Sequence, residues 1–162
     1  MTPESQWLSA PEGRAWRSYL RMHGQLRARL LQHLMRDSGL SEADYEVLVT
    51  LAGSPDGRMT SREVRCALIW EKSRLSHQVR RMEQRGLIIR EVNPADARSS
   101  LLRLTEWGGE VIERAVPPHV ERVREHFLSL LSPAELELLT RVGERVLTHL
   151  AREDEVDPPR EI

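Results

Sequence analysis

The sequence predicts a mainly α-helical fold with one small β-hairpin, and three observations lead to that class. Apolar residues recur at steps of three and four over most of the 162 residues, as they do in amphipathic helices. Extended patterning is confined to two short runs, 87–92 and 100–104, which flank a segment rich in turn-forming residues. With 40% hydrophobic residues, the chain is long enough for one domain with a sizeable core, or for a domain with an added dimerisation arm.

The first expected helix, about residues 11–37, is long. Residues 9–12 have the spacing of a capping box, and residues 37–39 (Asp-Ser-Gly) end the periodic stretch. Roughly 25 residues is well above the average helix of a globular protein. We therefore expect the apolar face of this helix to continue onto another chain.

Three shorter helices are predicted next. Residues 41–44 (Ser-Glu-Ala-Asp) start a helix that ends at the Gly- and Pro-containing loop 53–57. Residues 60–63 (Thr-Ser-Arg-Glu) form another capping box, which opens a short helix. A fourth helix is expected over about 72–85, because Gly86 can end it and an extended run follows.

The two strands, 87–92 and 100–104, enclose the loop 93–99 (Asn-Pro-Ala-Asp-Ala-Arg-Ser). Two helices followed by such a hairpin is the order of a winged helix-turn-helix. The sequence therefore predicts that fold for residues 41–104.

Two further helices and a tail complete the prediction. The fifth helix starts at residues 105–106, and Pro117 and Pro118 are expected to kink or restart it before its end near Leu130. A sixth helix is expected over about 132–150, since it opens with Ser-Pro-Ala-Glu. Residues 151–162 have acids, two prolines and no periodicity, so a disordered tail is expected there.

Charge is segregated along the chain, although the net charge is only −1. Between Arg58 and Arg103 there are eleven basic and five acidic residues, which gives +6, while the rest of the chain carries −7. A cationic middle between acidic ends favours attraction of phosphate to that middle. A solvated surface with chance clustering is the alternative.

The expected fourth helix concentrates this charge. Its apolar stripe is narrow, consisting of Leu75, Val79 and Met82. Its remaining face carries hydrogen-bond donors and positive charge, from Arg74, Ser76, His77, Gln78, Arg80, Arg81 and Arg85. The amino-terminal part of a recognition helix contacts base edges, and Arg and Gln can each make paired hydrogen bonds to a base. The candidates for base contact are Ser73, Arg74, His77, Gln78 and Arg81.

Residues 70–87, 93–99 and 104–106 resemble the MarR (multiple antibiotic resistance regulator) family of transcription factors, and the similarity extends over about residues 11–150. The resemblance implies a homodimer on a pseudo-palindromic operator, more often a repressor than an activator. It also implies that residues 11–38 and 105–150 form the dimerisation region and that 41–104 form the DNA-binding lobe. Many members release DNA when a small, often aromatic, ligand binds.

The resemblance also assigns roles to residues. It turns the positions of Ser73, Arg74, His77 and Arg81 toward double-stranded DNA. Arg98 takes the place of a wing arginine that enters the minor groove, and Asp96 is placed to hold its guanidinium. An ordinary surface ion pair is the alternative for these two. The full expected DNA-binding set is Ser73, Arg74, Ser76, His77, Gln78, Arg81, Asp96 and Arg98.

A small-molecule effector would bind between the dimer helices and the DNA-binding lobe, again by resemblance. Aromatic residues with a polar atom suit a phenol or an aromatic acid. The candidates are Trp16, Tyr19, His23, Tyr45 and Trp107. Their alternative role is ordinary core packing, and a regulator without any effector also remains open.

Other functions find little support in the sequence. The six histidines are scattered without metal-ligand spacing, and neither a phosphate-binding glycine loop nor a nucleophile elbow is present, so we expect no metal, no cofactor and no enzyme. The single cysteine, Cys66, is expected to be a small buried residue rather than a redox switch. A lone cysteine, no signal peptide and no membrane-length apolar run favour a cytoplasmic protein. The competing function is a winged-helix module whose basic helix binds an acidic protein partner.

Overall fold

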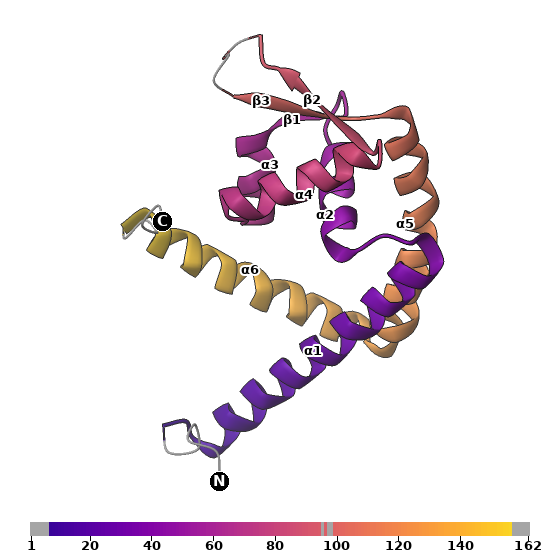
Figure 1. Ribbon diagram of the computed structural model, residues 1–162. Coiled ribbons are helices and arrows are strands. Elements are labelled where there is room, and N and C mark those ends of the chain that lie inside the picture. The colour runs from indigo at the N-terminus through magenta and orange to yellow at the C-terminus, as the bar shows by residue number, and fades with distance from the viewer. Residues whose placement is uncertain (1–6, 95, 97–98, 157–162) are drawn as a thin grey trace. The chain divides into compact units, whose positions relative to one another are not determined.

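The computed structural model describes residues 7–94, 96 and 99–156, and most of them are helical (Figure 1). The chain divides into two compact units, residues 1–122 and 123–162. The elements in chain order are α1 (Ala10–Ser38), α2 (Glu42–Ala52), β1 (Arg58–Thr60), α3 (Ser61–Leu68), α4 (Lys72–Gln84), β2 (Ile88–Val92), β3 (Ser100–Leu104), α5 (Glu106–His126), the 3-10 turn η2 (Leu128–Leu130) and α6 (Pro133–Val156).

Helices α2, α3 and α4 with the hairpin β2–β3, here called the wing, form a winged helix-turn-helix, which confirms the predicted fold class. The sheet is antiparallel, in the order β1-β3-β2. Ile88 pairs with Leu104 and Val92 with Ser100 along the wing. The three-residue strand β1 was not predicted, because it is too short to show an alternating pattern and its pairing partner β3 lies far along the chain.

One hydrophobic core joins the elements of the first unit. Val47, Leu48 and Leu51 of α2 are completely buried, as are Met82 of α4 and Leu102 of β3. The predicted stripe of α4 is confirmed, since all three of its residues are buried. Burying that stripe fixes which side of α4 faces away from the core.

Two helices differ from the prediction. Helix α5 continues through Pro117 and Pro118, so the expected restart is wrong. Proline lacks an N–H but its fixed φ suits a helix, and Ile112 and Ala115 are buried just before the pair. Helix α6 continues to Val156, so residues 151–156 are helical rather than a disordered tail, while 157–162 lie outside the described residues. None of the helices in the described part of the chain combines the length and apolar character needed to cross a membrane.

The first turn of α5 is fastened to the end of the helix-turn-helix. Thr105 Oγ1 donates hydrogen bonds to the carbonyl oxygens of Gly86 (2.7 Å) and Leu87 (3.0 Å), and it accepts one from the Gly108 amide (2.9 Å). A Cβ at Gly108 would lie 2.0 Å from the Leu87 oxygen. Glycine is therefore required for α5 to approach this backbone so closely.

The turn between α3 and α4 contains a strained residue. Ile69 has φ 53° and ψ 47°, the left-handed conformation, and its side chain is 91% exposed. For an L-residue this conformation costs about 1–2 kcal/mol, and β-branched residues tolerate it poorly. Because the Ile69 side chain is exposed, no burial of apolar surface offsets this cost.

Replacing Ile69 with asparagine is expected to stabilise the protein by about 1 kcal/mol, because asparagine adopts the left-handed region readily. Thermal or urea unfolding measures the change. Ile69→Val is the matched control, since valine keeps the β-branch and the strain. Equal stability of the two variants would contradict the strain argument.

Candidate nucleic-acid interface

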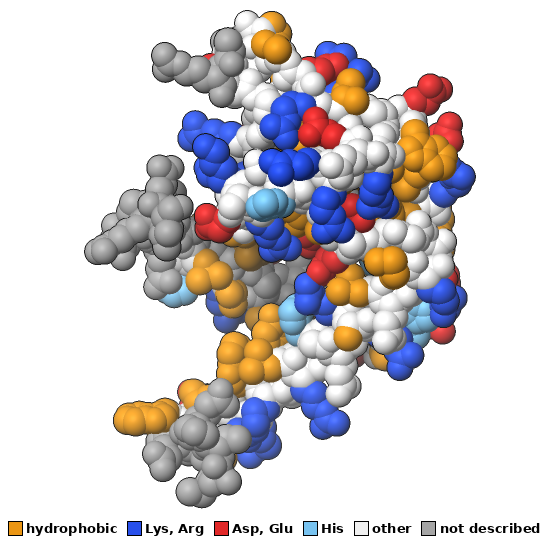
Figure 2. All heavy atoms as spheres, in the orientation of Figure 1, with side chains coloured by type: hydrophobic (Ala, Val, Ile, Leu, Met, Phe, Trp, Pro, Cys, Tyr) orange, Lys and Arg blue, Asp and Glu red, His pale blue; other side chains and the backbone are white. Residues whose placement is uncertain are grey.

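The face of α4 opposite its buried stripe is polar and exposed. Of the residues expected to contact DNA, Ser73, Arg74, Ser76, His77 and Arg81 are exposed. Figure 2 shows Lys and Arg side chains gathered over the part of the molecule that contains α3 and α4. No acidic residue lies in the first turn of α4. This face therefore presents positive charge and hydrogen-bond donors to the solvent.

Arg74 is held in place by an aromatic ring. Its Cζ lies 4.0 Å from the centroid of the Trp70 ring, and Trp70 is only 6% exposed. A cation–π contact of this kind contributes about 0.5–2 kcal/mol. Because Trp70 belongs to the core, it orders the Arg74 guanidinium on a rigid base.

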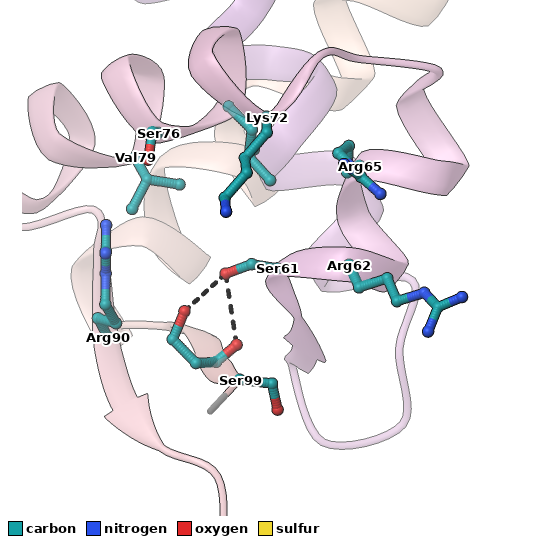
Figure 3. Close-up of a pocket in the computed structure, with 10 residues that line it drawn as sticks. Ser61, Arg62, Arg65, Lys72, Ser76, Val79, Arg90 and Ser99 are labelled. Carbon is teal, nitrogen blue, oxygen red and sulfur yellow. Dashed lines mark hydrogen bonds between the residues drawn. The ribbon is translucent and has the colours of Figure 1, made fainter. Parts of the chain in front are cut away.

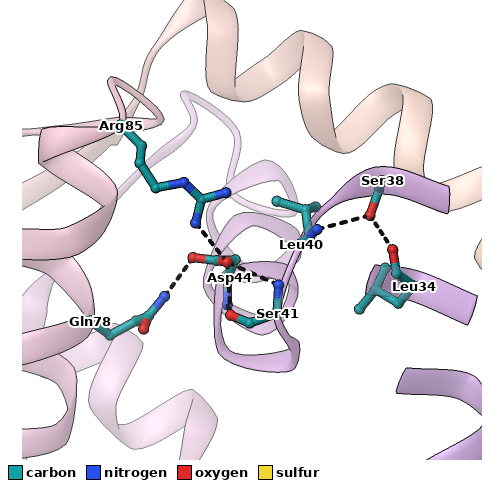
Figure 4. A network of polar contacts seen from close by, with 7 residues as sticks. All are labelled: Leu34, Ser38, Leu40, Ser41, Asp44, Gln78 and Arg85. Atoms are coloured by element: carbon teal, nitrogen blue, oxygen red, sulfur yellow. Dashed lines mark hydrogen bonds and ion pairs between the residues drawn. The ribbon is translucent and has the colours of Figure 1, made fainter. Parts of the chain in front are cut away.

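Gln78 does not belong to the exposed face, which corrects the sequence prediction. It is 5% exposed, and its Nε2 donates a 2.7 Å hydrogen bond to Asp44 Oδ1. Arg85 Nη1 donates to Asp44 Oδ2 at 2.8 Å (Figure 4). Gln78 and Arg85 therefore attach α4 to α2. Arg85 thus forms an ion pair within the protein.

Asp44 is the centre of this attachment. It is 1% exposed, and Oδ2 also accepts hydrogen bonds from the amide (3.0 Å) and the hydroxyl (2.7 Å) of Ser41. Burial raises the pKa of Asp44, but the hydrogen bonds from Arg85 and Ser41 outweigh it, so the pKa lies below its ordinary value. Asp44 therefore remains ionised and fixes the orientation of α4 on α2.

A basic hollow of about 340 Å³ lies between α3, α4 and the wing (Figure 3). Four hydroxyl groups line it, and the Ser61 hydroxyl contacts Ser100 Oγ at 2.8 Å and donates to the Ser100 carbonyl at 3.3 Å. The Lys72 side chain points into this space, whereas Arg62 points away from it. The cations around the hollow are Arg62, Arg65, Lys72 and Arg90.

These four cations were missed as site residues. Each was counted in the basic middle of the chain, but only folding brings Arg90 of β2 beside α3 and α4. The charge count was the one signal in the sequence that could have identified them. Hydroxyl groups and cations around one space match the chemistry of a phosphate group.

The tip of the wing is closed by local hydrogen bonds. Asn93 Nδ2 donates to Ser99 Oγ at 2.7 Å, and the Ser99 amide donates to the Asp96 carbonyl at 3.0 Å. The Asp96 side chain is exposed. Arg98 lies outside the described residues, so its expected pairing with Asp96 remains a prediction.

A second space, the apolar hollow, lies within the first unit between α1, α2 and α5. It measures about 340 Å³, and of the expected effector residues His23 and Tyr45 line it. Trp16 and Tyr19 do not line it; they stack on the exposed face of α1, with Tyr19 stacked in turn on His23. Trp107 is half exposed beneath Arg114 and does not line it either.

Cys66 is exposed, so the expectation of a buried cysteine is wrong. It lies in α3, whose buried position is Val64. Among the described residues, no three His, Cys, Asp or Glu side chains come together as a metal site.

Comparison with known proteins shows a consistent set of relatives. Residues 38–99 match the model of the MarR family. The transcriptional regulator HosA of Escherichia coli O111:H- is 32% identical over 116 residues, which cover 72% of this chain and 82% of HosA. The crystal structure of AbsC, a MarR family transcriptional regulator from Streptomyces coelicolor, has a TM-score of 0.86 at 38% identity and covers 90% of this chain and 97% of AbsC. Sco3205 from the same organism, a MarR family transcriptional regulator solved in complex with DNA, has a TM-score of 0.84 at 34% identity, over 95% of this chain and 93% of its own.

Proposed function

Because the chain belongs to the MarR family of DNA-binding transcription regulators, we propose that it acts as a homodimeric repressor on a pseudo-palindromic operator. The observation that carries this proposal is the exposed polar face of α4 beside the basic hollow. A helix with this face fits the major groove, where arginine can bind guanine O6 and N7 together.

Two kinds of contact are proposed for the DNA. Base edges are contacted from the exposed side of α4. Ser73, Arg74, Ser76 and His77 are exposed on its first two turns, and Arg81 is exposed in its last turn. The cations of the basic hollow bind a backbone phosphate, which positions the protein without reading sequence. Asp96 and Arg98 keep their proposed place at the minor groove.

Exposed apolar side chains on the terminal helices support the homodimer. On α6, Leu138, Val142, Val146 and Leu150 recur every four residues, and each is between 44% and 51% exposed. Helix α1 likewise exposes Trp16, Tyr19 and Leu20. Contiguous apolar surface of this kind marks an interaction site. In the proposed dimer, residues 11–38 and 105–150 pair, and two α4 helices enter major grooves about 34 Å apart.

The apolar hollow is the proposed effector site. A ligand there would favour dimer geometries whose α4 spacing no longer fits the operator, which is a shift between populations of conformations. Its walls come from α1 and α5, which carry the proposed dimer contacts, and from α2, to which α4 is attached. Ligand and operator would then affect each other's affinity equally.

Arg74→Ala is expected to weaken binding to DNA from upstream of the protein's own gene by about 1–3 kcal/mol, the magnitude of a bidentate base contact. Fluorescence anisotropy with a labelled fragment measures the affinity. Arg29→Ala on α1 is the matched control, since Arg29 is also exposed and the charge change is identical.

The same titration at several salt concentrations separates DNA binding from the competing function. Affinity should fall steeply and linearly on a log–log plot as salt rises, because phosphate contacts release counterions. Equal effects of Arg74→Ala and Arg29→Ala would contradict base contact by Arg74. No salt-sensitive affinity for any upstream fragment would favour the acidic protein partner instead.

A further inference from the structure

Two residues that line the apolar hollow each have a buried polar atom without a hydrogen-bond partner among the described residues. The atoms are Oε2 of Glu46 on α2 and Nδ1 of His119 on α5, and both residues line the hollow. A buried polar atom left unpaired destabilises the folded protein, because it has lost its hydrogen bonds to water without gaining others. Few such atoms occur in native proteins, and two that belong to residues lining one space point to a ligand whose binding brings hydrogen-bond donors to them.

The arginine that lines the hollow already has a partner. Arg27 Nε donates to Glu42 Oε1 at 2.8 Å, and Arg27 Nη2 donates to Glu42 Oε2. Such a two-point pairing matches the charge of Arg27 with that of Glu42. The charge of Arg27 is therefore already matched within the protein, whereas Glu46 is a carboxylate in the lining whose Oε2 has no hydrogen-bond partner among the described residues.

The protonation of the two atoms follows from their burial. Burial raises the pKa of Glu46, and the neighbouring Glu42 raises it further, whereas Arg74 and Arg27 lower it. Burial lowers the pKa of His119, which favours the neutral ring at neutral pH. A cation brought against Glu46 would stabilise its ionised form, while an anion there would be repelled.

The remaining walls suit an apolar body. Leu26, Leu30, Leu31 and Leu34 of α1 form one side. The Tyr45 and His119 rings form another, with centroids 4.6 Å apart and planes tilted by 47°. The face of Tyr45 can also attract a positive charge through its ring electrons.

We propose that the apolar hollow binds a small organic cation, an aromatic or aliphatic body carrying a protonated amine, whose N–H groups donate to Glu46 Oε2 and, in the tautomer that leaves it unprotonated, to His119 Nδ1. This inference rests on the proposed function only in taking the hollow as an effector site. It replaces the aromatic acid or phenol that the resemblance implied with a ligand of the opposite charge. Glu46 determines the preference for a positively charged ligand. The leucines contribute affinity but do not discriminate between ligands of different charge.

Glu46 also connects the hollow with the DNA-reading face. Arg74 lies close enough to lower the pKa of Glu46, and Arg74 stacks on Trp70 at the start of α4. A cation that pairs with Glu46 changes the electrostatic environment of Arg74.

Three probes of matched size test the charge preference by isothermal titration calorimetry on the full chain without DNA. They are 2-phenylethylamine, which is protonated at neutral pH, 2-phenylethanol, which is neutral, and phenylacetate, which is an anion. The amine is expected to bind at least about tenfold more tightly than phenylacetate, because a desolvated charge pair is gained. Phenylacetate binding as tightly as the amine, or no binding of the amine at millimolar concentration, would overturn the proposal.

Glu46→Gln tests the selecting residue, since glutamine keeps the shape and removes the charge. Affinity for the amine should fall by about tenfold or more, with little change for 2-phenylethanol. Glu113→Gln is the matched control, because Glu113 is exposed on α5 and does not line the hollow. An unchanged amine affinity in Glu46→Gln overturns the proposal. Failure of the wild-type chain to bind DNA while the amine still binds would contradict the proposed function alone.

Discussion

One glutamate on the apolar stripe of α6 is expected to separate the proposed dimer: Val146→Glu should raise the dimer dissociation constant by about 100-fold, or about 2.8 kcal/mol. Val146 is half exposed in the single chain and would be covered by the partner. In a two-fold interface each substitution appears twice, so two carboxylates lose water. Burying an unpaired carboxylate costs more free energy than this change in dissociation constant represents, so 100-fold is a lower limit for the expected effect.

Sedimentation equilibrium measures the dissociation constant, and anisotropy measures the loss of operator affinity that should accompany it. A monomer contacts one half-site and loses the gain in effective concentration that the second half-site provides. Thr148→Glu is the matched control, because Thr148 is exposed on the opposite side of α6 and acquires the same charge. Val146→Glu remaining as dimeric as Thr148→Glu would exclude this stripe from the interface.

Asp44→Ala is expected to destabilise the protein by about 2–4 kcal/mol, because it leaves the buried Gln78 amide without its acceptor and removes the ion pair of Arg85. The same change removes the capping box at the start of α2. Glu63→Ala is the matched control: Glu63 occupies the same position in the capping box of α3, where both of its hydrogen bonds go to Thr60. That variant should lose only about 1 kcal/mol. Urea unfolding monitored by circular dichroism measures both, and equal losses would show that the bonds from α4 add nothing.

The depressed pKa of Asp44 gives this prediction a pH dependence. Its folded-state pKa lies below the ordinary value of 3.8, so its contribution is fully present above pH 3.8 and is lost as the pH falls through the folded pKa. Asp44→Asn removes this titration. The acid side of the stability curve should therefore be flatter in Asp44→Asn than in the wild type, and curves of equal slope would contradict the assignment.

The helix starts and the buried face of α4 could be predicted because both depend on residues close in sequence. Thr60 and Glu63 are three residues apart, and the capping box that they form is local chemistry. The stripe of Leu75, Val79 and Met82 follows from helical spacing alone. The same local signal predicted where α6 begins.

Several features that were not predicted depend on residues far apart in the sequence. The polar side chain of Gln78 resembles that of its exposed neighbours, and only its partner Asp44, 34 residues earlier, explains why it is buried. Strand β1 depends on pairing with β3, and the basic hollow depends on Arg90 meeting α3. Cys66 was predicted to be buried because free cysteines usually are. It is exposed, because it lies on the outer side of α3. Long-range contacts determined the positions of Gln78, β1 and the residues of the basic hollow.

The contacts of Thr105 and Gly108 couple movement of the start of α5 to movement of the backbone that follows α4. Thr105 bonds to the backbone directly after α4, and Gly108 leaves no space between α5 and the Leu87 oxygen. The two segments can neither slide past each other nor close further without breaking a hydrogen bond or creating a steric overlap. A tilt of the first turn of α5 is therefore coupled to a tilt of the segment that follows α4.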